Sequence, residues 1–148
     1  MRELLACVDL SDATDAVVAE AAELAHGRGG RVHLLHVAAD EPVIAGYDKD
    51  PISPYTRDDR AGELLDEHGQ LRDLAARLEA EGLEVEPLVV MGATIDKILE
   101  VADRIDAGHL VVGSHGRSGL HHLLTGSVTE ALLKRSTRPV VVVPVHHR

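Results

Sequence analysis

The residues best suited to chemistry lie in one stretch near the carboxyl end of the chain. Gly113 ends an apolar run, Gly116 follows after two residues, and Gly126 and Ser127 come after nine more. Glycines let backbone N–H groups approach an anion because no Cβ stands in the way. Gly126, Ser127 and Val128 also begin a predicted helix, whose unpaired amides and dipole attract negative charge. The segment therefore indicates an anion site suited to phosphate.

Polar side chains beside these glycines can add to such a site. The Ser127 hydroxyl is a further donor, and His115 and Arg117 can supply positive charge. Arg117 is equally suited to holding the loop in place. Ser114 and Ser118 flank this region, but no G-x-S-x-G nucleophile elbow accompanies them. We find no dedicated base in the chain and predict no catalytic residue.

The familiar nucleotide motifs are absent from the sequence. It has no G-x-x-x-x-G-K-[ST] and no G-x-G-x-x-G after the first apolar run. No serine- and glycine-rich loop follows that run either, which disfavours an ATP-pyrophosphatase. Glycines after strands often only form turns, so the glycine spacing alone leaves a structural role open.

The histidines do not form a metal-binding pattern. His121–His122 and His146–His147 are adjacent pairs, and neighbours on a regular element point in different directions. His33 and His36 fall on opposite faces of a predicted strand. No cysteine cluster or H-E-x-x-H accompanies them, so no metal site is predicted.

Composition excludes several classes of protein. The chain has 148 residues and a net charge of −10, which disfavours binding to nucleic acid and to anionic membranes. Its only cysteine, Cys7, permits no internal disulfide and lies in an apolar run, as a buried inert thiol would. With no long apolar run and an early acidic residue, we expect no membrane insertion, no secretion signal and a cytoplasmic location.

The elements that position the glycine segment follow from hydrophobic periodicity. Apolar runs rich in Val and Leu are typical of strands buried on both faces of a parallel sheet. Segments of helical periodicity separate them. This order predicts one α/β domain over residues 1–148, a doubly wound open parallel sheet with helices on both faces. The predicted strands are Leu4–Leu10, Arg31–Ala38, Leu83–Met91, His109–Gly113 and Pro139–Pro144.

The helix boundaries are predicted from capping residues and glycines. Gly62 and Gly69 each weaken the second helix by about 1 kcal/mol relative to alanine. The predicted boundaries are Ser11 or Asp12 as the cap of the first helix, Gly29 and Gly30 at its end, Gly82 at the end of the second, and Thr94 as the cap of the third.

The connection Ala39–Asp58 is long and holds three prolines and both tyrosines. Loops of that length are commonly functional or mobile. The segment can therefore be a lid over the site or a solvent-exposed loop with no role in it. With two tyrosines and no other aromatic residue, the chain would hold an adenine base by backbone hydrogen bonds and aliphatic walls.

The whole chain resembles the universal stress protein family, in its ATP-binding branch. The spacing Gly113-x2-Gly116-x9-Gly126-Ser127 matches that branch's motif. So do VVGS at 111–114, HGR at 115–117, PVVVVP at 139–144, VDLSDAT at 8–14, LLHV at 34–37 and GATIDKIL at 92–99. Thr125 departs from the family, where Leu is common. The resemblance implies the strand order 3-2-1-4-5 of a Rossmann-like, adenine nucleotide α-hydrolase-like fold.

The resemblance also implies roles for individual residues. Asp9 would approach the ribose, and the Val37 backbone would bond the adenine edge. Asp9 and Ser11 could instead serve only the first helix as caps. The remaining expected nucleotide-binding residues are Cys7, Val8 and Val112 around the base, and Gly113, Ser114, His115, Gly116, Arg117, Gly126, Ser127 and Val128 around ribose and phosphates.

The function so implied is that of an ATP-binding regulatory module in a stress response. It would bind ATP or another adenine nucleotide, with or without Mg²⁺, and act as a homodimer through the last strand, Pro139–Val145, or through an unidentified protein partner. A slow ATPase or phosphotransferase using the same pocket is the alternative. The third hypothesis is an adaptor protein that binds no nucleotide, and the intact glycine motif counts against it.

Overall fold

A computed structural model describes residues 2–11, 13–38, 57–114 and 127–144. Strands and helices alternate along it, as the periodicity predicts. The strands are β1 (Arg2–Cys7), β2 (Gly30–Ala38), β3 (Glu84–Met91), β4 (Ala107–Gly113) and β5 (Val140–Val143). The helices are α1 (Thr14–Arg28), α2 (Arg57–Ala80), α3 (Thr94–Arg104) and α4 (Ser127–Arg135).

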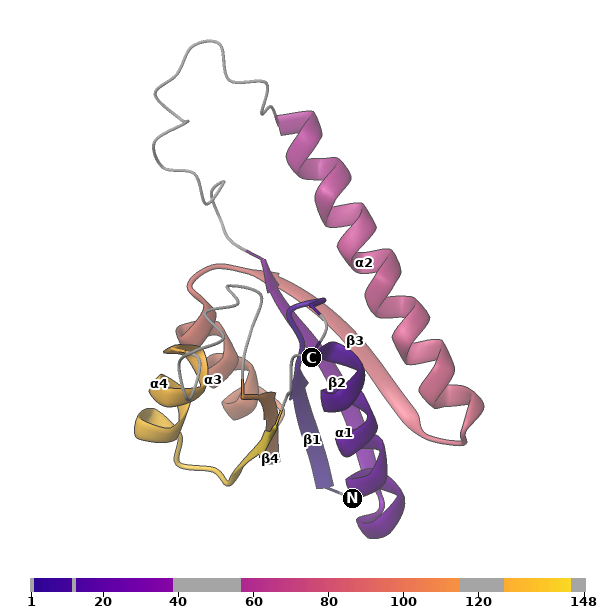
Figure 1. Cartoon of the computed structure of the whole chain (residues 1–148), viewed down its shortest axis with the longest axis vertical. Helices are drawn as coiled ribbons and strands as arrows, with labels where there is room; N and C mark the ends of the chain where they lie inside the picture. Colours follow the sequence, from indigo (N-terminus) through magenta and orange to yellow (C-terminus); the bar gives the residue numbers. More distant parts are fainter. Residues whose placement is uncertain (1, 12, 39–56, 115–126, 145–148) are drawn as a thin grey trace.

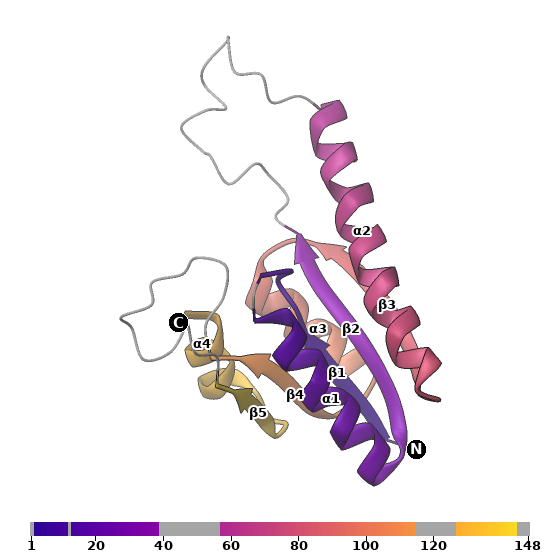
Figure 2. The same ribbon diagram turned by 45° about the vertical axis from the view of Figure 1, so that its right-hand side comes forward.

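The strands form one parallel sheet in the order β3-β2-β1-β4-β5 (Figures 1 and 2). The predicted fold class and strand order are therefore confirmed. Strands β1, β2 and β4 occupy the middle of the sheet, and their side chains are largely buried. That burial explains their continuous apolar sequences, because both faces of a central parallel strand contact helices.

Helices cover both faces of the sheet (Figures 1 and 2). Under α1 and α2 lies one core cluster, in which Leu4, Ala6 and Leu34 meet Val17 and the later half of α2. A second cluster lies under α3 and α4 and is built from the strand residues of opposite parity, such as Leu5 and Leu35. Alternation along each strand thus divides the apolar residues between two cores.

The first strand is shorter than predicted. It ends at Cys7, whereas the apolar run extends to Leu10. The carboxylate oxygen Oδ1 of Asp9 accepts a hydrogen bond from the Ser11 amide at 3.0 Å, and Leu10 has a φ of 62°. An aspartate that bonds the backbone two residues on forms a turn, and this turn ends the strand before the apolar pattern does.

Two glycine boundaries are confirmed and two details are wrong. Gly29 ends α1 with φ 69° and donates its amide to the Ala25 carbonyl, and Gly82 follows α2 with φ 91°. Gly30, however, already belongs to β2. Thr94 is the first helical residue of α3 and not its cap, because Ala93 holds the cap position and no side chain caps that end.

Helix α2 is continuous over 24 residues in spite of its two internal glycines. Its later half is anchored by Leu71, Leu74, Ala75 and Leu78 in the first core cluster. Tertiary packing of this kind outweighs a propensity penalty of about 1 kcal/mol per glycine. Of the predicted loop Ala39–Asp58, residues 39–56 lie outside the described residues, and the last two belong to α2.

No helix in the described part of the chain is long and apolar enough to cross a membrane. That residues 1–148 form a single domain stays a prediction.

Candidate functional site

The predicted site lies where the direction of chain connection reverses. Strands β1 and β4 are neighbours in the sheet, and both run toward the same edge. After β1 the chain passes to α1 on one face, whereas the helix that follows β4 packs on the other face. Doubly wound folds bind ligands at the carboxyl ends of the strands, at the point of such a reversal.

The end of β4 is fixed by two hydrogen bonds. The Thr129 hydroxyl donates to the Gly113 carbonyl at 2.7 Å, and the Ser114 amide donates to the Val143 carbonyl at 2.8 Å. Thr129 is buried, with 3% of its surface exposed. Because Thr129 lies in the first turn of α4, this bond holds the amino terminus of that helix beside the last residue of β4. Our sequence reasoning missed Thr129, although its place in the first turn of the helix predicted after Gly126 was a signal in the sequence.

Several predicted phosphate ligands lie at this helix terminus or beyond the described residues. Ser127 is the first residue of α4, as expected, and Val128 is 36% exposed in its first turn. The predicted ligands outside the described residues are His115, Gly116, Arg117 and Gly126.

The loop after β1 is organised by its own polar side chains. Besides the bond that Asp9 accepts from the Ser11 amide, the Ser11 hydroxyl oxygen accepts a hydrogen bond from the Ala13 amide at 3.2 Å. Ser11 therefore shapes the turn before α1 and does not cap the helix as predicted, because Ala13 holds the cap position and no side chain caps that end. The Asp9 carboxylate can accept further hydrogen bonds beside the one from Ser11. This turn therefore does not exclude a contact between Asp9 and a ribose, which stays a prediction.

The backbone of Val37 faces β1 beyond the end of their ladder. The ladder between β1 and β2 ends at Cys7 and Leu35, and the Val8 amide adds a bond to the Leu35 carbonyl at 2.9 Å. Ala38 accepts from the Gly92 amide and so faces β3. Successive residues of a strand face opposite neighbours, so the N–H and C=O of Val37 face β1. This position suits the predicted contact with an adenine edge.

The predicted aliphatic walls are already packed in the cores. Val8 is 5% exposed and lies in the cluster under α1 and α2, whereas Val112 is 3% exposed and lies under α3 and α4. Cys7 is partly buried against that second cluster. Burial raises the pKa of the Cys7 thiol to about 12, so it is protonated at neutral pH, as expected of an inert thiol.

Two buried histidines of β2 carry polar contacts that sequence reasoning missed. His33 Nε2 lies 2.6 Å from Glu3 Oε2. On the opposite face, His36 Nδ1 lies 3.0 Å from the Val8 carbonyl oxygen and Nε2 lies 3.2 Å from Glu67 Oε2. Their opposite parity confirms that they do not form a facing pair. A histidine inside an apolar strand was itself the signal, since buried polar groups require partners.

Among the described residues, no three His, Cys, Asp or Glu side chains are grouped closely enough to hold a metal ion.

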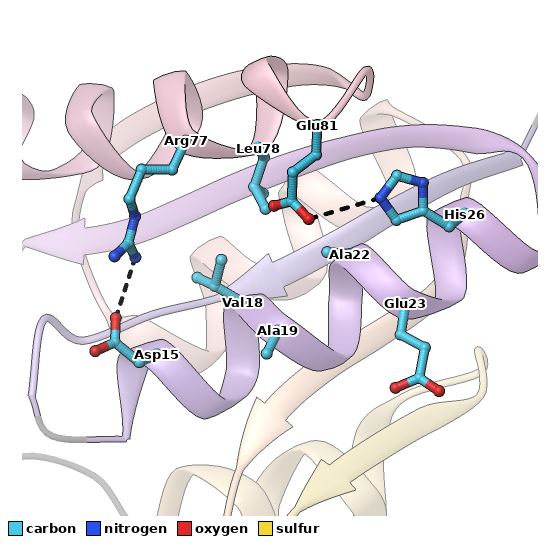
Figure 3. A pocket seen from close by; sticks show the side chains of 9 residues that line it. All are labelled: Asp15, Val18, Ala19, Ala22, Glu23, His26, Arg77, Leu78 and Glu81. Carbon is cyan, nitrogen blue, oxygen red and sulfur yellow. Dashed lines mark hydrogen bonds and ion pairs between the residues drawn. The ribbon is translucent and has the colours of Figure 1, made fainter.

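A groove of about 550 Å³ lies between α1 and α2, on one face of the sheet (Figure 3). Its floor is formed by Val18, Ala22 and Leu78. Two contacts span it. Arg77 and Asp15 form an ion pair at 3.1 Å, and His26 Nε2 lies 3.9 Å from Glu81 Oε1, an ion pair when the histidine is protonated. Exposed pairs of this kind contribute little to stability, and the groove contains none of the predicted nucleotide ligands.

Comparison with known proteins gives consistent matches over the length of the chain. A sequence model of the Universal stress protein family matches residues 1–144. Universal stress protein MJ0577 of Methanocaldococcus jannaschii is 24% identical over 96% of this chain and 94% of its own. Universal stress protein MJ0531 of the same organism is 32% identical over 75% and 71%.

Solved structures agree on the fold. The structure of MJ0577 superposes with a TM-score of 0.81 at 24% identity, over 99% of this chain and 98% of that one. A universal stress protein from Archaeoglobus fulgidus, solved in complex with dAMP, superposes with a TM-score of 0.68 at 23% identity, over 97% of each chain.

Proposed function

This chain belongs to the universal stress protein family, and on that premise we propose that it binds ATP or another adenine nucleotide at the carboxyl ends of β1 and β4. The observation that carries the proposal is the hydrogen bond from Thr129 to the Gly113 carbonyl. It ties Gly113, the first residue of the Gly113-x2-Gly116-x9-Gly126-Ser127 motif, to the first turn of α4, the helix that begins at Ser127, so that a strand end and a helix amino terminus lie together. Helix amino termini bind phosphate groups through unpaired amides and their dipole.

The base end of the site has separate support. Val37 presents backbone N–H and C=O groups toward β1 past the last ladder pair, which suits the edge of an adenine. The related Archaeoglobus fulgidus protein is described in complex with dAMP, an adenine nucleotide. We propose ATP as the nucleotide, with Mg²⁺ accompanying its phosphates where present.

We propose a regulatory role in a stress response, in the cytoplasm and through a homodimer or an unidentified protein partner. The support is the sequence itself, in which no residue is recognisable as a catalytic base. A slow ATPase or phosphotransferase using the same pocket is the alternative, and the rate of phosphate release separates the two.

The proposed homodimer pairs β5 with its copy. The carbonyls of Pro139 and Val143 accept hydrogen bonds from β4, so the backbone groups of Val140 and Val142 face away from the sheet. An edge strand with outward N–H and C=O groups can pair with another chain. The other edge of the sheet, β3, is less suited to pairing. The Gly92 amide donates to Ala38 of β2, so alternation along the strand turns the backbone of Pro87 outward. Proline has no N–H to offer a partner strand.

Calorimetry with ATP tests the proposed site. A side chain at Gly126 would stand where phosphate must approach, so Gly126→Val should weaken binding at least about tenfold, or 1.4 kcal/mol. Gly27→Val is the matched control, because no neighbouring atom lies within 4 Å of a Cβ there. The placement is wrong if folded Gly126→Val binds ATP as the wild type does.

A further inference from the structure

His36 of β2 lies beside the carboxyl end of β1, one of the two strand ends of the proposed site. Its Nδ1 lies 3.0 Å from the Val8 carbonyl oxygen, and a carbonyl only accepts, so Nδ1 carries a proton and donates it. The side chain is almost fully buried, with 6% of its surface exposed. A buried hydrogen bond of this kind holds the Val8 carbonyl firmly, because breaking it leaves an unsatisfied polar group.

The Val8 carbonyl would be the next hydrogen-bond acceptor if the ladder between β1 and β2 continued. In a parallel pair, the Val8 amide bonds the Leu35 carbonyl, as observed at 2.9 Å, and the Val8 carbonyl would next accept from the Val37 amide. The ladder stops at Cys7 and Leu35 instead. The His36 imidazole engages one lone pair of this carbonyl, and among the described residues the Val37 amide does not bond the other.

Glu67 of α2 fixes the far side of the ring. Its Oε2 lies 3.2 Å from His36 Nε2, and its side chain is 15% exposed. Within the described residues this oxygen makes no hydrogen bond of good geometry, so the contact is mainly electrostatic. The carboxylate attracts the ring when Nε2 carries a proton as well, and the contact then adds to the hold on the imidazole. The ring therefore cannot turn away from Val8 without losing this contact as well.

We propose that His36 is a positioning residue for the adenine end of the nucleotide site. Its imidazole engages the Val8 carbonyl, leaves the Val37 amide for the base, and is held by Glu67. The role rests on the proposed function, because it concerns how the strand ends receive a nucleotide. His36 itself does not touch the ligand, since alternation places its side chain on the face opposite that of Val37.

Three substitutions separate this role from a general contribution to folding. His36→Leu removes both contacts and should weaken ATP binding at least about tenfold. His36→Asn retains an N–H donor at the place of Nδ1 and should bind within about threefold of the wild type. His33→Leu is the matched control: it removes the other buried histidine–glutamate contact of β2, on the opposite face of the sheet, and should leave ATP affinity unchanged.

Amide NMR supplies a readout that a purely structural role would not move. ATP should shift the Val37 amide resonance in the wild type and in His36→Asn. Glu67→Ala should weaken ATP binding in the same direction as His36→Leu, and unchanged binding would remove Glu67 from the proposal.

The outcomes distinguish this role from the proposed function. If the wild type binds no ATP, both fall together. If the wild type binds and folded His36→Leu binds equally well, or the Val37 resonance does not respond, only the role of His36 is overturned. A loss in His36→Asn as large as in His36→Leu also overturns it, and this comparison decides the matter if His36→Leu does not fold.

Discussion

The Thr129 hydroxyl and the Gly113 carbonyl are 2.7 Å apart, although 16 residues separate them in the chain. The bond joins a strand end to the first turn of a helix. It thereby fixes the relative position of the two backbone segments on which the proposed phosphate site depends.

Replacing Thr129 by valine keeps the shape of the side chain and removes its donor. The Gly113 carbonyl then loses a buried partner, so the free energy of unfolding should fall by about 1–3 kcal/mol. ATP affinity should fall as well, because the start of α4 is no longer held. Denaturant titration and calorimetry measure the two effects. Thr129→Ser keeps the hydroxyl and is the control; equal ATP binding by all three proteins would show that the bond does not organise the site.

Intrinsic turnover should be low. With no recognisable base, phosphate release from ATP should stay far below the about 10 s⁻¹ of a median enzyme. A phosphate-release assay on protein freed of contaminating ATPases measures it. Sustained hydrolysis near that rate, abolished by Gly126→Val, would favour the enzyme alternative.

The dimer should depend on the outer edge of β5. Val142→Pro removes an N–H that faces away from β4, so the sheet should survive while the dimer weakens. Val89→Pro is a matched control, because it removes an outward N–H from β3 at the other edge. Sedimentation equilibrium compares the three proteins. A monomeric wild type, or a folded Val142→Pro with undiminished dimer affinity, would exclude β5 as the interface.

Cys7 should resist alkylation and should make stability depend on pH. Burial raises the pKa of its thiol from about 9 to about 12, so between those values the unfolded chain ionises while the folded one stays protonated. Stability from this group is therefore complete below pH 9 and is lost as pH rises toward 12, by at most about 1.4 kcal/mol per pH unit.

The difference in unfolding free energy between the wild type and Cys7→Ala isolates this contribution. The difference should shift in favour of Cys7→Ala above pH 9 and stay constant below it. Rapid reaction of native Cys7 with iodoacetamide at neutral pH would contradict the protonated, sheltered state.

Much of the fold was predictable from the sequence because burial leaves a local periodic trace. Continuous Val and Leu runs such as Pro139–Pro144 indicate strands between two helical layers, and the glycines at 29 and 82 mark helix ends. The glycine spacing around Gly113 also indicated where an anion would bind. These signals need only the residues within one element, so one sequence carries them.

Only the tertiary structure decided which polar groups meet. Periodicity extended β1 to Leu10, but the Asp9 turn ends it at Cys7, and that early end exposes Val37 toward β1. His36 lies 28 residues from Val8 in the chain, yet the two are bonded. The partner of a buried hydrogen-bonding group depends on register between strands and on the placement of distant helices. These are properties of the assembled sheet, and no local pattern records them.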